Sequence, residues 1–118
     1  MAINETAKKI VKILDEKKAE DIKLIRISEL TVIADYFIIA NGTSNTHVRA
    51  LAEEVEEVLA TEDGITPRSI EGRSTGWILL DYGEVVVHVF TPADRDYYSL
   101  ERLWKDGAFE DISDIITE

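Results

Sequence analysis

The stretch from Gly76 to Thr91 constrains the fold most, because it has the pattern of two apolar strands joined by a tight turn. Its residues, GWILLDYGEVVVHVFT, include many β-branched and aromatic side chains, which fit a pleated surface. An Asp-Tyr-Gly-Glu turn separates the arms, and its glycine can adopt the positive φ that a hairpin turn requires. With Tyr82 and Gly83 as the two loop residues, Trp77 is predicted to pair with His88.

This hairpin is apolar on both of its faces. Side chains alternate between the two faces of a strand. One face is predicted to carry Ile78, Leu80, Val85, Val87 and Val89, and the other Trp77, Leu79, Val86, His88 and Phe90. We expect helices to cover the first face, whereas the second needs either more of the chain or a partner.

Apolar spacing elsewhere predicts three helices and three further strands. The helices are expected over residues 4–18, 43–60 and 94–105, and the strands over 22–27, 36–40 and 65–70. The run at 36–40 is almost wholly apolar and is therefore predicted to be a central strand, whereas Pro67 argues for an edge position for the strand around it.

The order α-β-β-α-β-β-β-α predicts an α/β fold, in which helices pack on a mixed β-sheet to form an α/β sandwich. We expect residues 1–118 to form a single domain with an acidic tail from about residue 107.

Charge and composition exclude several classes of function. The formal net charge is −11, and residues 27–118 hold six Lys/Arg against nineteen Asp/Glu, a balance of −13. Direct nucleic-acid recognition is not expected, because phosphate contacts need a basic surface. No apolar run approaches the roughly 20 residues of a membrane helix. The absence of cysteine excludes disulfides and thiolate metal sites, and fits a cytoplasmic protein.

The turn at residues 41–44, Asn-Gly-Thr-Ser, raises the question of enzymatic chemistry. A strand, a small-residue turn and a helix N-terminus can hold a phosphate, and nucleotidyltransferases add two strand carboxylates that bind Mg²⁺. Here the neighbouring strands offer only Asp81 and, across a turn, Glu84. His47 and His88, the only two histidines, have no metal-ligand spacing. A nucleotide-dependent transferase that has lost or moved its metal ligands stays open as the alternative to a non-enzymatic binding protein.

Six short motifs, taken together in their order and spacing, resemble the ribosomal silencing factors of the Iojap family. They are Asp35-Tyr36-Phe37-Ile38-Ile39, Gly42-Thr43-Ser44, Glu71-Gly72, Gly76-Trp77-Ile78-Leu79-Leu80-Asp81, Val86-Val87-His88-Val89-Phe90, and the run from Arg95 to Trp104. The resemblance extends from the first helix to Trp104, and the acidic tail after Gly107 matches no motif of the family.

The resemblance implies a fold related to nucleotidyltransferases but without their catalytic carboxylate pair, and hence no enzyme activity and no cofactor. It implies a homodimer in the free state. It also implies binding to the large ribosomal subunit through ribosomal protein L-fourteen, which would block joining of the small subunit and repress translation when nutrients are scarce.

We predict that the second hairpin face makes the partner contact, since an aromatic, apolar centre with charged flanks is typical of interface hot spots. The predicted partner-binding residues are Trp77, Leu79, Val86 and His88, with Tyr98 from the third helix at the edge. The alternative is that Trp77 belongs to the core of the fold itself.

Overall fold

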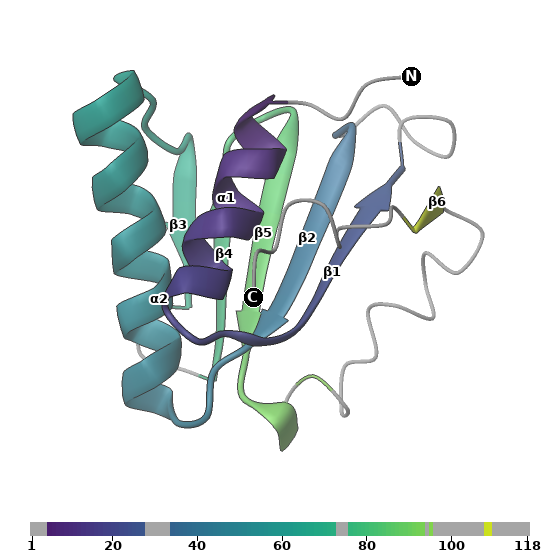
Figure 1. Cartoon of the computed structure of the whole chain (residues 1–118), viewed down its shortest axis with the longest axis vertical. Helices are drawn as coiled ribbons and strands as arrows, with labels where there is room; N and C mark the ends of the chain where they lie inside the picture. The colour runs from purple at the N-terminus through teal and green to yellow at the C-terminus, as the bar shows by residue number, and fades with distance from the viewer. Residues whose placement is uncertain (1–4, 28–33, 73–75, 94, 96–107, 110–118) are drawn as a thin grey trace.

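The structure, a computed structural model, describes residues 5–27, 34–72, 76–93, 95 and 108–109. These residues form a mixed sheet with two helices against it (Figure 1). In chain order the elements are α1 (Glu5–Glu16), β1 (Glu20–Arg26), β2 (Tyr36–Asn41), α2 (Asn45–Val58), the π-helical turn η1 (Leu59–Asp63), β3 (Ser69–Glu71), β4 (Trp77–Asp81), β5 (Val85–Phe90) and β6 (Ala108–Phe109).

The six strands lie in the order β3-β4-β5-β2-β1-β6. β2 and β5 pair in parallel, and every other neighbouring pair is antiparallel. These two strands are buried along nearly their whole length, as their continuous apolar sequences predict. The predicted central strand at 36–40 is therefore confirmed, and so is the edge position of the strand near Pro67, although β3 is shorter than expected.

The register of the β4–β5 hairpin differs from the prediction. Trp77 pairs with Phe90, not with His88, and the loop residues are Gly83 and Glu84. The Asp81 carboxylate accepts a hydrogen bond from the Gly83 N–H at 2.8 Å, and Gly83 has φ of 87°. The predicted Tyr82-Gly83 loop is wrong because these contacts move the turn one residue further on. Pairing shifts by two residues, which leaves every side chain on its predicted face.

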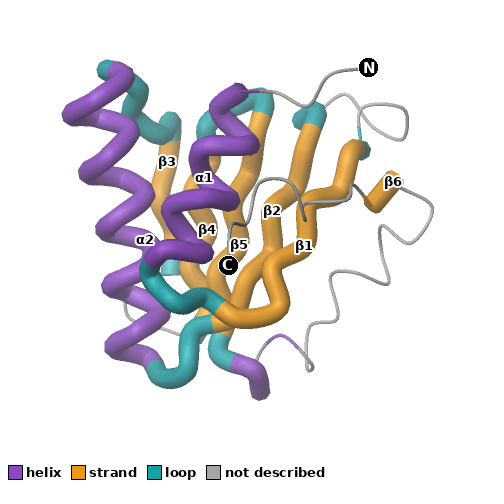
Figure 2. The backbone as a smooth tube through the Cα atoms, in the orientation of Figure 1, coloured by secondary structure: helices purple, strands orange, loops and turns teal. Residues whose placement is uncertain are grey.

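One face of the sheet, called here the helix-covered face, packs against α1 and α2 (Figure 2). All of its buried residues are apolar, and most are fully enclosed. The sheet contributes Ile22, Leu24, Tyr36, Ile38, Ala40, Ile78, Leu80, Val85, Val87 and Val89, and the helices and η1 contribute Ala7, Ile10, Val11, Ile13, Leu14, Val48, Leu51, Ala52, Val55 and Leu59. The expectation that helices would cover this hairpin face is confirmed.

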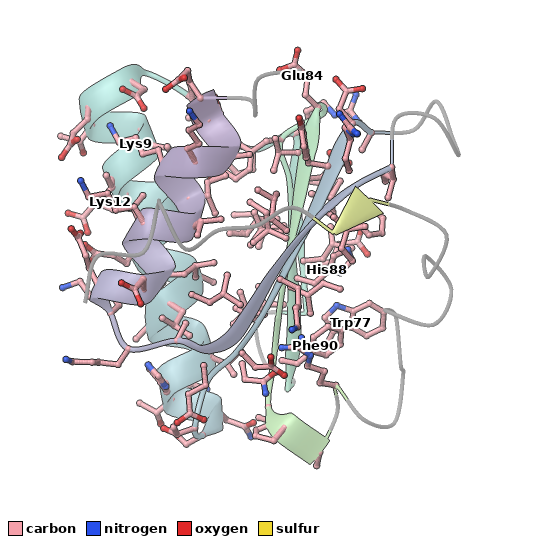
Figure 3. The ribbon with its side chains drawn as sticks, turned by 45° about the vertical axis from the view of Figure 1, so that its right-hand side comes forward. Lys9, Lys12, Trp77, Glu84, His88 and Phe90 are labelled. Atoms are coloured by element: carbon pink, nitrogen blue, oxygen red, sulfur yellow. The ribbon has the colours of Figure 1, made fainter. Side chains whose placement is uncertain are left out.

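The opposite side of the sheet, called here the helix-free face, holds a second apolar cluster that neither α1 nor α2 touches. In Figure 3, Trp77, His88 and Phe90 lie on the side of the strands away from these helices. Its buried members are Ile25, Ile27, Ala34, Phe37, Ile39, Val86 and Phe90, with Trp77 and Leu79 partly exposed beside them.

The helices agree with prediction where the structure describes them. α1 begins at Glu5 and α2 is capped by Ser44, whose hydroxyl accepts from the His47 N–H at 3.1 Å. Gly64, with φ of 66°, ends the second helix after η1. The predicted third helix over 94–105 and the acidic tail lie outside the described residues, apart from Arg95 and β6. No helix among the described residues is long and apolar enough to cross a membrane.

Candidate functional site

Four aromatic rings meet on the helix-free face, and we call them the aromatic cluster: Phe37, Trp77, His88 and Phe90. The Trp77 and Phe90 rings stack at 5.0 Å between centroids, as their cross-strand pairing allows. His88 lies 4.8 Å from Phe37, 5.9 Å from Trp77 and 6.2 Å from Phe90. These residues come from β2, β4 and β5, the adjacent strands at the middle of the sheet.

One hydrogen bond fixes the chemistry of this cluster. The Trp77 Nε1–H donates to His88 Nδ1 at 3.1 Å. Because an indole N–H can only donate, His88 Nδ1 must be unprotonated, and the proton of the neutral ring is on Nε2. The pair therefore orients the indole and selects one tautomer of the histidine.

Burial keeps this histidine uncharged. His88 is 3% exposed, and desolvation lowers its pKa from 6.5 to about 4. Of the three rings near it among the described residues, two are hydrocarbon rings. A histidine with such a lowered pKa is neutral and only weakly basic near neutral pH, and it remains a hydrogen-bond donor through Nε2.

The predicted partner-binding residues differ in how open they are. Trp77 and Leu79 are partly exposed, whereas Val86 is 9% and His88 3% exposed. The structure brings these four side chains together on one face, while Tyr98 lies outside the described residues. Phe37 was not among the predicted residues, although the alternation of strand 36–40 places it on the same face as Ile39 and could have revealed it.

The Asn-Gly-Thr-Ser turn is filled by the protein's own side chains. His47 Nδ1 accepts from the Thr43 N–H at 2.8 Å, and His47 Nε2 lies 2.9 Å from the Lys17 carbonyl oxygen. Ser44 Oγ also accepts a hydrogen bond from the His47 N–H. An anion at this helix N-terminus would therefore have to displace both this contact and the one between His47 and the Thr43 N–H. A Cβ on Gly42 would come within 2.8 Å of the Val48 nitrogen, which shows how tightly the turn packs on α2.

The two carboxylates considered for metal binding belong to the hairpin turn. Asp81 accepts from Arg68 Nη2 at 3.3 Å and from the Gly83 amide, while Glu84 is exposed at the tip. Within the described residues, no group of three or more His, Asp or Glu side chains is placed to hold a metal ion.

Comparison with known proteins identifies the family. A family model described as "Ribosomal silencing factor during starvation" matches residues 1–118. The chain belongs to this family of ribosomal silencing factors. The resemblance seen in the six motifs is thereby confirmed.

Relatives with the silencing-factor name cover most or all of this chain. The ribosomal silencing factor of Bacillus subtilis is 42% identical over 99 residues, which is 83% of each protein. That of Halalkalibacterium halodurans is 38% identical over 118 residues, covering 99% of this chain and all of the relative.

A crystal structure from the same group of relatives supports the fold. A protein from Chromobacterium violaceum, 42% identical, superposes with a TM-score of 0.83 over 89% of this silencing factor and 88% of that chain. The α/β fold with a mixed sheet, expected from the order of elements, is confirmed.

Proposed function

We propose that this silencing factor binds the large ribosomal subunit, through ribosomal protein L-fourteen, and sterically blocks joining of the small subunit. The result is lower translation under nutrient limitation, in the cytoplasm. The observation that carries the proposal is the family match over residues 1–118. The names of the bacterial relatives support it.

The helix-free face is the contact surface in this proposal. Its argument is chemical: Trp77 and Leu79 are partly exposed apolar side chains next to a buried aromatic cluster. A partly exposed aromatic anchored by a hydrogen bond loses little conformational freedom on binding, which is typical of hot-spot residues. The two helices are already used on the opposite face, so a partner here need not disrupt the main core.

Electrostatics favours a basic protein as partner over ribosomal RNA. Residues 27–118 carry a balance of −13, and α2 presents acidic side chains such as Glu53 and Glu57 to solvent. Such a surface repels phosphates and attracts a basic protein, which raises the association rate and orients the encounter. Many ribosomal proteins are basic, so this charge directs the factor to protein.

Steric blocking requires no catalysis, and the proposal includes none. The turn that would hold a phosphate is occupied by His47 and Ser44, and the hairpin carboxylate Asp81 is tied to Arg68. These contacts count against the alternative, a nucleotidyltransferase-like enzyme. The proposal also includes a homodimer in the free state, which analytical ultracentrifugation over a range of protein concentrations would test.

Co-sedimentation with isolated large subunits tests the binding, and light scattering of subunit joining tests the block. The factor should pellet with large subunits and lower the amplitude of joining when small subunits are added. Nucleotide and Mg²⁺ titration by calorimetry on the same preparation should give no heat. Pelleting without any effect on joining would contradict the blocking mechanism, and Mg²⁺-dependent nucleotide turnover would favour the enzyme.

A further inference from the structure

His88 has one ring nitrogen with a partner and one without. Nδ1 accepts the Trp77 indole N–H at 3.1 Å, so the ring proton is on Nε2. Nε2 is buried and has no hydrogen-bond partner among the described residues. The side chain as a whole is 3% exposed, so Nε2 is shielded from bulk solvent.

A buried N–H without an acceptor is unfavourable, and native proteins keep few of them. The rings described around His88 offer no acceptor, because Phe37 and Phe90 are hydrocarbon rings and the Trp77 indole nitrogen can only donate. The donor is also on the helix-free face, beside two side chains that are partly open to solvent, Trp77 and Leu79. In the part of the chain that the structure describes, His88 Nε2 is thus an unused donor below the surface proposed for partner binding.

We infer that the ribosomal partner completes this site by placing an uncharged oxygen acceptor, such as a main-chain carbonyl, on His88 Nε2. The inference rests on the proposed function and adds the chemistry of the recognised group. His88 becomes a specificity-determining residue, because a partner segment that cannot present an acceptor leaves the donor unsatisfied. Since Nε2 is inaccessible in the free structure, the side chains over it must shift when the partner binds.

The acceptor is uncharged for a physical reason. A carboxylate at Nε2 would have to be desolvated among aromatic rings, and its attraction would be strongest for a charged imidazolium. The surroundings instead hold His88 neutral, with a pKa lowered to about 4 by burial. A carbonyl satisfies a neutral N–H and brings no charge into the cluster.

Two substitutions at this position separate the two nitrogens. In His88→Asn the side-chain oxygen can replace Nδ1 as the acceptor for Trp77, while nothing remains at the Nε2 position. In His88→Gln the amide reaches the Nε2 position and can still donate. His88→Phe keeps an aromatic ring in the cluster but lacks both nitrogens. It replaces His88→Asn in the comparison if the smaller asparagine side chain impairs folding. Thermal melting confirms the fold of each variant before binding is measured.

Affinity for isolated large ribosomal subunits is the readout. His88→Asn and His88→Phe should bind about tenfold more weakly than wild type, the effect of one lost hydrogen bond, and His88→Gln should stay within about threefold. Equal binding by wild type, His88→Asn and His88→Phe would overturn the inference. A loss in His88→Gln and His88→Phe, with normal binding by His88→Asn, would also overturn it, because His88 would then act only by holding Trp77.

Trp77→Glu, measured in the same assay, distinguishes this failure from failure of the proposed function. If Trp77→Glu abolishes pelleting while the His88 variants bind normally, the face is the contact surface and only the acceptor contact is wrong. If Trp77→Glu folds and also binds normally, the helix-free face is not the contact surface, and the inference fails with it.

Discussion

The two faces of the sheet are built from alternate residues of the same strands, yet they differ in chemistry. The helix-covered face is enclosed by α1 and α2, and most of its buried side chains are aliphatic. The helix-free face contains three aromatic residues and the ring of His88, whose Nε2 has no partner among the described residues. A buried polar atom without a described partner occurs beside each face, the Tyr82 hydroxyl next to the helix-covered cluster and His88 Nε2 on the helix-free face. The faces differ in that the helix-free face is aromatic and leaves Trp77 and Leu79 partly exposed.

This difference explains how one small sheet can provide both stability and recognition. Aliphatic side chains that interlock with two helices remove apolar area from water and need no hydrogen bonds. Aromatic side chains with polar atoms add directional contacts, which favour recognition of a partner more than packing of a core. A change on the first face should therefore affect folding, and a change on the second should affect binding.

The largest expected effect comes from charging the helix-covered face. Leu80 is fully buried, and Leu80→Asp would place a carboxylate among aliphatic side chains, which should destabilise the fold by at least about 4 kcal/mol. We expect this variant to lack a cooperative thermal transition. The adjacent change Leu79→Asp, on the partly exposed opposite side, is the matched control and should still melt cooperatively. Comparable unfolding of both variants would remove the distinction between the faces.

The next effect in size is acid sensitivity from His88. Its pKa is about 4 when folded and 6.5 ordinarily, so between these values the unfolded chain binds a proton that the folded chain does not. Stability should therefore fall as pH falls from 6.5 to 4, by about 3 kcal/mol in all from this group.

Urea unfolding of wild type and His88→Phe at several pH values isolates this contribution, because the carboxylates common to both proteins cancel in the difference. The wild type should lose more stability than the variant as the pH falls. If the two proteins lost stability in parallel as the pH falls, His88 would have the same pKa in the folded and the unfolded chain. That result would contradict the argument that burial lowers its pKa.

A smaller effect concerns salt and the rate of association. The −13 balance of residues 27–118 predicts that association with large subunits slows severalfold as ionic strength rises, since the Debye length falls to about 8 Å at 0.15 M. Dissociation from the apolar helix-free face should change less. Stopped-flow measurements at low and moderate salt check both rates, and a flat association rate would exclude electrostatic steering.

The smallest effect is expected where the strands end, at the β4–β5 turn. Asp81→Asn combined with Glu84→Gln removes the carboxylates that a transferase mechanism would use. Glu84 is exposed, and the ion pair of Asp81 is with an exposed arginine, Arg68, so its contribution to stability is small. Binding to large subunits should be unchanged, and stability should fall by no more than about 1 kcal/mol. A complete loss of subunit binding would show that the turn carries function after all.

The architecture could be predicted from the sequence because period and composition dominate it. Alternation in the hairpin assigned each of its side chains to the correct face, and the apolar run at 36–40 identified a central strand. The register of the β4–β5 hairpin could not be predicted from the sequence. It depends on the hydrogen bond that the Asp81 carboxylate accepts from the Gly83 amide, and no periodic pattern encodes this contact.

The candidate site could be predicted only in outline. The sequence placed Trp77 and His88 on one face, but their hydrogen bond depends on side-chain orientation across β4 and β5. The burial of His88 and the participation of Phe37 depend on neighbouring strands that are distant in sequence. The packing of His47 into the Asn-Gly-Thr-Ser turn likewise needed the approach of α1 to α2.

The most direct test of the account compares folding and large-subunit pelleting for Trp77→Glu. The helix-free face is the contact surface in this account, so the variant should fold and melt cooperatively but bind at least about thirtyfold more weakly, since a hot-spot loss is roughly 2 kcal/mol or more. If Trp77→Glu unfolds as Leu80→Asp should, Trp77 is part of the core. If it folds and pellets like wild type, the contact is elsewhere and the central claim is wrong.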